Sequence, residues 1–172
     1  DGFENMTLLV YGNNATTTFS YNSQTKSLNG LTLDAITSTA SNRILNKQYT
    51  RDAMGRVTTV SNSAMGYTNP NSSVTMGQAY SFTHTYDQFN RLANTTGTYE
   101  TGEGPDSYSL EMVYDKAGGI TRKTQVSNVP NMNYDLTYTY KANSHQLASV
   151  TNINPGGTAS TFTPNTSGSV SN

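Results

Sequence analysis

A short pattern recurs along this chain and constrains its fold more than any other feature. In the segment 49–57 an aromatic residue, Tyr49, precedes a turn with an aspartate and a glycine, and Val57 then opens a second apolar segment. Turns of this kind fall near positions 1, 22, 52, 87, 115, 141 and 165, and those at 22 and 141 carry one additional residue. A pattern that recurs about every 20 to 50 residues is typical of repeat architectures. The sequence therefore predicts a single repeat array over residues 1–172.

The turn residues share one chemistry. Aspartate or asparagine at the first turn position can accept hydrogen bonds from backbone N–H groups two residues on. Glycine or asparagine three residues later can adopt the left-handed conformation of a type I turn followed by a bulge. We therefore predict β-hairpin tips, with positive φ at Gly55 and Asn90. The predicted turn residues are Asp52, Gly55, Asp87, Asn90, Asp115, Gly118, Asn165 and Gly168.

The segments that flank the turns have the pattern of strands. Residues 81–86, 110–114 and 136–140 alternate large side chains with small or polar ones and are rich in Thr and Tyr. The stretch 31–44 lacks an amphipathic stripe, which predicts strand and loop. The aromatic strand residues before the turns are Tyr21, Tyr49, Tyr86, Tyr114, Tyr140 and Phe162. Because one hairpin is marginally stable in water, the hairpins are expected to pair edge to edge into one curled, all-β antiparallel sheet.

Composition excludes several classes of protein. Charged residues make up 12% of the chain, against about 25% in an average domain, and neutral Thr, Ser, Asn and Tyr supply the polarity. Such a surface favours an extracellular location. A net charge of −1 without any basic cluster argues against nucleic-acid binding. The absence of cysteine excludes disulfides and thiolate metal sites, and no apolar run is long enough for membrane insertion.

At the turns and their flanking strands the sequence resembles the YD-repeat family, also called RHS repeats, whose pattern is close to Y-x-Y-D-x-x-G-R-L-x-x-V. The best matches are Tyr86-Asp87 with Arg91-Leu92, Asp52 with Gly55-Arg56-Val57, and Tyr114-Asp115 with Gly118. The resemblance implies a strip of antiparallel strands that spirals into a hollow shell. Such shells occur in bacterial polymorphic toxins, insecticidal toxin complexes and cell-surface teneurins. A wall, a container or an adhesive surface is the implied function.

The chain also departs from the family pattern. The segments 63–79 and 99–107 lengthen their units, which predicts wider loops there. The family's core-associated segment, close to P-x-x-x-x-D-P-x-G, has no counterpart because the chain contains no Asp-Pro pair. Autoproteolysis is therefore not expected from this chain. Because a cut sheet leaves unpaired edges, we expect its partners to be further repeats of the same parent chain or head-to-tail copies that form a filament.

Few residues are candidates for chemistry. His84 lies in a predicted strand and His145 in a hairpin tip, and neither has a cysteine or a carboxylate pair at ligand spacing. Structural or surface roles are predicted for both histidines. Glu100, Glu103 and Asp106 could hold a hard cation such as calcium, although their spacing favours a solvated hairpin loop. The sequence predicts neither a cofactor nor an enzyme.

Two functions remain open. The first is a structural shell, stalk or filament that encapsulates a toxin or displays a partner. The alternative is a recognition or adhesion module, in which exposed tyrosines bind carbohydrate, such as a surface glycan, or a partner protein. Burial of the tyrosines favours the first function and an exposed aromatic platform favours the second. Sequons for N-glycosylation stand at Asn5, Asn14, Asn71, Asn94 and Asn165.

Overall fold

The computed structural model describes residues 5–36, 41–68, 75–76, 78–101, 104–153 and 160–163. The described residues are almost entirely strand, with one short 3-10 helix, η1 (Pro130–Met132). No helix in this part of the chain is long and apolar enough to cross a membrane. The strands are β1 (Leu8–Val10), β2 (Thr16–Tyr21), β3 (Leu28–Ile36), β4 (Ser41–Arg51), β5 (Val57–Asn62), β6 (Tyr67–Thr68), β7 (Thr75–Met76), β8 (Tyr80–Tyr86), β9 (Leu92–Thr101), β10 (Gly104–Tyr114), β11 (Ile120–Ser127), β12 (Tyr134–Tyr140), β13 (Leu147–Asn152) and β14 (Ser160–Phe162).

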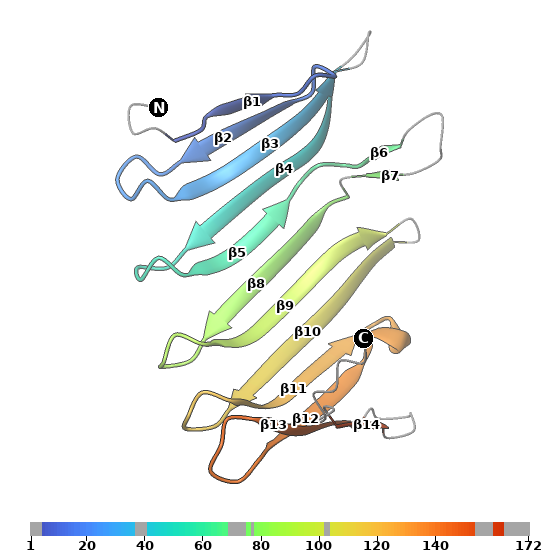
Figure 1. Ribbon diagram of the computed structural model, residues 1–172. Coiled ribbons are helices and arrows are strands. Elements are labelled where there is room, and N and C mark those ends of the chain that lie inside the picture. The colour runs from blue at the N-terminus through green and yellow to red at the C-terminus, as the bar shows by residue number, and fades with distance from the viewer. Residues whose placement is uncertain are drawn as a thin grey trace, which may run out of the picture. The chain divides into compact units, whose positions relative to one another are not determined.

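The strands pair in the order of the sequence (Figure 1). Twelve of them form one hydrogen-bonded sheet in the order β1-β2-β3-β4-β5-β8-β9-β10-β11-β12-β13-β14, and β6 pairs with β7 in a separate hairpin. Neighbours such as β4 and β5, or β12 and β13, are antiparallel. The predicted all-β array of antiparallel hairpins is therefore confirmed.

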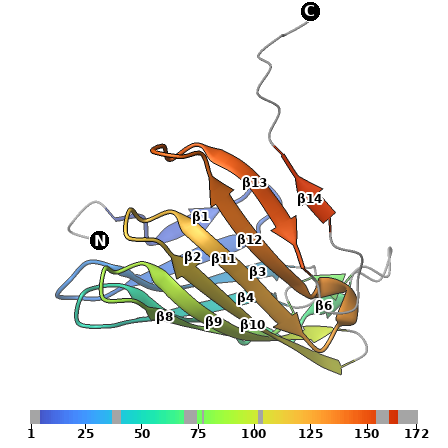
Figure 2. The same cartoon turned by 90° about the horizontal axis from the view of Figure 1, so that it is seen from below.

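The chain divides into two compact units. The first comprises Asp1–His84 and Gly97–Asp106, and the second comprises Thr85–Thr96 and Ser107–Asn172. Figure 2 shows β11, β12 and β13 of the second unit side by side, in agreement with their register. That residues 1–172 form a single array stays a prediction.

In the first unit the strand register separates two chemically different faces. Tyr49 on β4, Val60 on β5 and Phe82 on β8 are direct partners and form an apolar row. One residue further along each strand, the side chains point to the opposite face. A parallel row of hydroxyls lies there, formed by Thr50, Thr59 and Thr83. The sheet of this unit is therefore amphipathic.

The second unit repeats this division. Tyr138 on β12, Val150 on β13 and Phe162 on β14 form an apolar row. On the opposite face the Thr139 and Ser149 hydroxyls are 2.6 Å apart. Each unit thus has a row of aromatic and aliphatic side chains on one face and paired hydroxyls on the other.

Within each unit, no second layer of described elements packs on the sheet to bury a usual domain core. Among the described residues only Ala15 and Ala64 are buried apolar residues, and no large side chain is fully buried. The least exposed of the described residues is polar. Asn62 is 2% exposed, and its Oδ1 accepts hydrogen bonds from the backbone N–H groups of Asn46 at 2.8 Å and Ala64 at 3.2 Å. Stability within each unit therefore comes from strand pairing, tips and contacts between neighbouring repeats.

The lengthened segments differ from expectation in one case. Within 63–79 the structure describes the extra hairpin β6–β7, which fits the predicted insertion. The expected wide loop at 99–107 is wrong, because β9 continues to Thr101 and β10 already starts at Gly104. Thr101 Oγ1 donates to the Gly104 carbonyl at 2.6 Å. The additional residues lengthen the two strands, since alternation of side chains continues along both of them.

Candidate functional site

The best-formed local structure is the hairpin tip at Asp52. The Gly55 N–H donates to the Asp52 carbonyl at 2.9 Å, and the Asp52 N–H donates to the Arg56 carbonyl at 3.0 Å. Asp52 Oδ1 accepts the N–H groups of Met54 and Arg56, both at 3.0 Å. Gly55 has φ of 81°, the left-handed value predicted for it. Two backbone hydrogen bonds and two bonds to one carboxylate oxygen therefore hold this turn.

The tip at Asp87 has the same geometry with asparagine in place of glycine. Asp87 Oδ1 accepts the N–H groups of Phe89 at 2.8 Å and Arg91 at 2.9 Å. Asn90 has φ of 64°, so the predicted left-handed conformation is present here as well. Asparagine tolerates this conformation because its short side chain can bond locally.

The tip at Asp115 uses two glycines. Asp115 Oδ1 accepts the N–H groups of Ala117 and Gly119, both at 2.8 Å, and Gly118 has φ of 92°. Gly119 stands where the other two tips have arginine. A Cβ at Gly119 would lie 3.1 Å from the Tyr140 ring, so the tyrosine of the next repeat occupies this space.

The two longer tips place their left-handed residue differently. Asn22 Oδ1 accepts the N–H groups of Gln24 at 2.9 Å and Thr25 at 2.8 Å, but the residue with positive φ is Lys26, at 59°. In the tip that begins at Lys141 the residue with positive φ is Asn143, whose φ is 55°. The additional residue in each tip shifts the position at which the chain reverses. The tips predicted at Asp1 and at Asn165 with Gly168 lie outside the described residues.

One turn was not anticipated. Between β1 and β2, the Asn14 N–H donates to the Tyr11 carbonyl and the Tyr11 N–H to the Ala15 carbonyl, both at 2.9 Å. Asn14 has φ of 63°, so the backbone repeats the Asp52 geometry with tyrosine in place of aspartate. The available signal was Gly-Asn-Asn at positions 12–14, between two strand-like segments.

Arginine reinforces two of the tips. Arg56 Nε lies 2.6 Å from Asp52 Oδ2, and Arg91 Nε lies 2.7 Å from Asp87 Oδ2. Partial burial raises the pKa of the Asp87 carboxyl, but hydrogen bonds from the Arg91 backbone and side chain outweigh it and lower the pKa below its ordinary value. The carboxylate therefore stays charged, which is the state that accepts all of these bonds.

Arg91 also joins its repeat to the next one. Its guanidinium carbon lies 4.4 Å from the centroid of the Tyr114 ring, a cation–π contact. Its Nη1 donates to the Asp115 carbonyl at 3.2 Å. A single side chain thus holds its own tip through Asp87 and clamps the aromatic residue and the backbone of the following tip.

Tyrosine hydroxyls form a second connection between repeats. Tyr114 Oη donates to the Leu92 carbonyl at 2.8 Å, and Tyr140 Oη donates to the Ile120 carbonyl at 2.9 Å. Leu92 and Ile120 are the aliphatic residues that follow the preceding tips. In the first unit Tyr21 Oη donates to the Met6 carbonyl at 2.9 Å. The repeat tyrosine therefore acts as a hydrogen-bonding tie as well as an apolar strand residue.

We expect Tyr114→Phe to lower the free energy of unfolding by about 1 kcal/mol, the usual net value of one part-buried hydrogen bond. Urea denaturation measures the change. Tyr138→Phe is the matched control, because no partner for the Tyr138 hydroxyl is found among the described residues. Equal effects of the two substitutions would contradict the proposed tie.

The remaining repeat aromatics lie where predicted. Tyr49 near the end of β4 and Tyr86 at the end of β8 are half-buried, and Phe162 on β14 is 65% exposed. The ammonium group of Lys47 lies 5.3 Å from the Tyr49 ring centroid. Because the tyrosines are only half-buried, their exposure alone does not separate the two functions considered from the sequence.

The residues considered for chemistry lie on different elements. His84 is half-buried on β8, where burial lowers its pKa, and His145 is exposed in a tip. Glu100 and Asp106 lie on β9 and β10, so the predicted solvated loop is wrong for them, and Glu103 lies outside the described residues. Within the part of the chain that the structure describes, no three His, Cys, Asp or Glu side chains could share a metal ion.

Three of the five sequons can be placed. Asn14 is exposed in the β1–β2 turn, Asn94 is exposed on β9, and Asn5 is half-buried ahead of β1. Asn71 and Asn165 fall outside the described residues. Exposure of Asn14 and Asn94 leaves both side-chain amides accessible to a modifying enzyme.

Solved structures of larger proteins contain a similar sheet. The Tc holotoxin pore of Photorhabdus luminescens matches with a TM-score of 0.65 and 21% identity, over 81% of this chain and 7% of that one. A crystal structure of TcdB2-TccC3-Cdc42 matches with a TM-score of 0.65 and 20% identity, over 82% of this chain and 7% of that one. A crystal structure of TcdB2-TccC3 without its hypervariable C-terminal region matches with a TM-score of 0.65 and 19% identity, over 81% of this chain and 7% of that one. This likeness shows the fold, and the chain spans about 7% of the length of these proteins.

Sequence comparison identifies the family. No curated protein is significantly similar to the chain. The family model described as teneurin YD-shell, however, matches residues 9–172. The same residues contain the described tips and the tyrosine and arginine contacts between repeats. The predicted resemblance is confirmed: this chain belongs to the teneurin YD-shell family.

Proposed function

We propose that this chain is a segment of the wall of an extracellular β-shell that encapsulates or displays another polypeptide. The observation that carries the proposal is the tie between neighbouring repeats, in which Arg91 and Tyr114 lock one tip onto the next. Such ties stiffen a sheet along its edge without any catalytic group. They suit a wall, because a wall has to keep its shape over many repeats.

The single-layer sheet supports the same function. A wall needs two faces of different character, one toward its contents and one away from them. Each unit has this property, with an apolar row such as Tyr49, Val60 and Phe82 backed by a row of threonine hydroxyls. The proposed wall includes further repeats that pair with this sheet strand to strand, as its described strands pair with each other.

Under this proposal the protein is not an enzyme. His84 belongs to a strand and His145 to a tip, and the tip aspartates accept hydrogen bonds from backbone N–H groups. A toxin cargo is proposed by analogy with the complexes named above, and copies joined head to tail into a filament are the alternative assembly. Exchange of both histidines for glutamine should leave an architectural role intact.

Thiol labelling tests the wall directly, because the chain has no cysteine of its own. Thr83→Cys and His84→Cys place single thiols at adjacent positions of β8, on opposite faces. Each variant is labelled with a large maleimide reagent, first in this chain and then in the complete polypeptide that carries it. For a closed wall we expect one thiol, and only one, to react at least about tenfold more slowly in the complete polypeptide, since access limits its rate.

Other labelling patterns exclude the proposal. If neither thiol is slowed, both faces remain open, as in an adhesive module. If both are slowed, the segment is packed on two sides, as in the interior of an ordinary domain. Circular dichroism of the two variants verifies that each sheet is intact before the rates are compared.

A further inference from the structure

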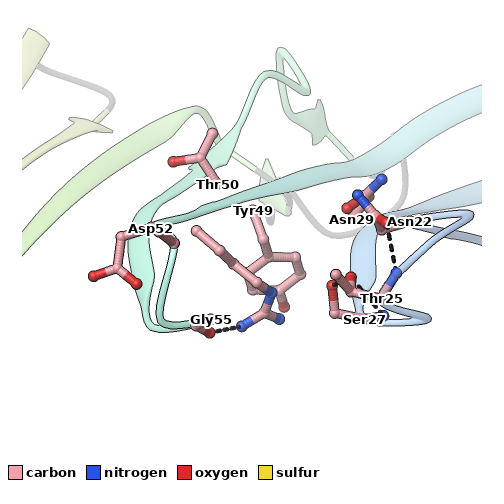
Figure 3. A pocket seen from close by; sticks show the side chains of 10 residues that line it. Asn22, Thr25, Ser27, Asn29, Tyr49, Thr50, Asp52 and Gly55 are labelled. Atoms are coloured by element: carbon pink, nitrogen blue, oxygen red, sulfur yellow. Dashed lines mark hydrogen bonds between the residues drawn. The ribbon is translucent and has the colours of Figure 1, made fainter.

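A pocket lies between the Asn22 tip and the Asp52 tip in the first unit (Figure 3). Its volume is about 530 Å³, which falls in the range of sites for small ligands, roughly 300–1,000 Å³. In Figure 3 Tyr49 and Gly55 lie on one side, and Thr25 and Ser27 lie on the other. The two tips that form it belong to consecutive repeats, so the pocket occupies the interval between two repeats.

The interval between these two tips is bridged differently from the interval between the Asp87 and Asp115 tips. In the second unit the interval between the Asp87 and Asp115 tips is filled by Arg91, which lies over the Tyr114 ring. Arg91 immediately precedes Leu92, and the residue that immediately precedes Leu28 in the Asn22 repeat is Ser27. A serine side chain is too short to reach across the interval. Arg51, which lies two residues after Tyr49, crosses part of this interval instead: its guanidinium carbon is 6.0 Å from the Tyr49 ring centroid, and the space beside it forms the pocket.

The charge in the pocket comes from Arg51. Its guanidinium donates to the carbonyls of Gly55 at 3.3 Å and Leu28 at 3.4 Å, which are long bonds to neutral acceptors. The ion pairs found among the described residues involve other arginines, each bound to an aspartate: Arg43, Arg56, Arg91 and Arg122. Arg51 is exposed and keeps donors available, because a guanidinium has five.

The other groups around the pocket add no competing negative charge. Asp52 lines it, but its carboxylate is bound by Arg56 and by tip N–H groups. The Lys47 ammonium lies 5.3 Å from the Tyr49 ring centroid and adds a second cation nearby. Neutral polar side chains complete the lining, namely Asn22, Thr25, Ser27 and Asn29. The pocket thus combines an available guanidinium, an aromatic ring and several hydrogen-bonding groups.

We propose that this pocket binds a sugar that carries a carboxylate, such as a hexuronic acid unit of an acidic polysaccharide. The Arg51 guanidinium would hold the carboxylate, because its planar fork matches that group. The sugar ring would pack against Tyr49. Its hydroxyls would bond to Ser27 and Asn29. The proposal goes beyond the shell function, since a wall needs no ligand.

Two other ligand classes fit less well. A peptide would add as a strand to a free sheet edge, but β3 and β4 pair with each other and with further strands on their outer sides. A phosphate would seek a cluster of backbone N–H groups. At both tips such groups are already bound, by Asn22 Oδ1 and by Asp52 Oδ1.

Calorimetric titration of the full chain with trigalacturonic acid tests the proposal. We expect binding that is at least about tenfold tighter than that of neutral trigalactose, because charge-assisted hydrogen bonds are the strong ones. Arg51→Gln should weaken binding of the acidic trisaccharide by a similar factor. Arg43→Gln is the matched control, since it removes the same charge from the same strand at a distance from the pocket, and should leave the affinity unchanged.

Ser27→Arg provides a steric test. The introduced side chain should occupy the open interval as Arg91 does, so that binding is lost while the melting temperature does not fall. Ser27→Ala should retain binding. Amide chemical shifts of Thr25 and Gly55 locate the ligand in each case.

Several outcomes would overturn the proposal. Equal affinity for the neutral and acidic trisaccharides would remove the role of Arg51, and unchanged binding in Ser27→Arg would place the ligand elsewhere. Equal binding of acetate or triglutamate would show a general response to carboxylates and not a sugar site. These results are independent of thiol labelling on β8, so the pocket and the wall can fail separately.

Discussion

Gly30→Ala is expected to lower the free energy of unfolding by about 1–3 kcal/mol, the usual cost of forcing added atoms into a packed site. Gly30 pairs with Gln48 across β3 and β4. A Cβ at Gly30 would lie 2.6 Å from the Lys47 carbonyl oxygen and 2.7 Å from the Gln48 side-chain amide. The glutamine can move away, but the carbonyl belongs to the backbone of β4. The two strands would have to separate locally.

Urea denaturation of the full chain measures this effect, with Gly12→Ala as its matched control. No atom lies within 4 Å of a Cβ added at Gly12, so the same chemical change meets open space there. We expect the free energy of unfolding of the control to stay within about 0.5 kcal/mol of the original, as for most surface substitutions. Equal losses in the two variants would show that the β3–β4 contact is not what Gly30 protects.

Gly55→Val is expected to cost about 1–2 kcal/mol for a different reason. No atom lies within 4 Å of a Cβ added at Gly55, but φ there is 81°. A β-branched side chain is strained in this left-handed conformation. The loss therefore comes from the backbone alone, and thermal or urea unfolding would register it as a lower midpoint with an unchanged sheet signal.

Gly55→Asn is the control for this second change. Asn90 stands at the equivalent place of its own tip with φ of 64°, so asparagine is compatible with the turn. We expect its cost to be less than half that of valine, because asparagine visits the left-handed region with little strain. A Gly55→Asn variant as unstable as Gly55→Val would mean that bulk at the tip, and not backbone conformation, sets the stability.

Local chemistry explains what could be predicted from the sequence. The aspartate and the left-handed residue of each tip are neighbours in the chain, so their roles at Asp52–Gly55 and Asp87–Asn90 follow from turn preferences alone. Alternation of period two sets which residues share a face. The strands, the tips and the all-β class are therefore encoded within short segments. The wide loop predicted at 99–107 is wrong because side-chain alternation continues to Thr101 and again from Gly104, so the additional residues lengthen two strands.

Only the tertiary structure revealed how repeats are joined. Tyr114 and Tyr140 donate to main-chain carbonyls, and a carbonyl leaves no signature in the sequence because every residue has one. Arg91 belongs to a recognisable motif, but its contact with Tyr114 crosses from one repeat to the next over strands of variable length. The pocket beside Tyr49 lies between two consecutive tips, where Arg51 reaches the Leu28 carbonyl of the neighbouring repeat. The sequence by itself determined the repeats of this protein. The pairing of neighbouring repeats decided the ties and the pocket, because both depend on the register that brings residues distant in the chain together.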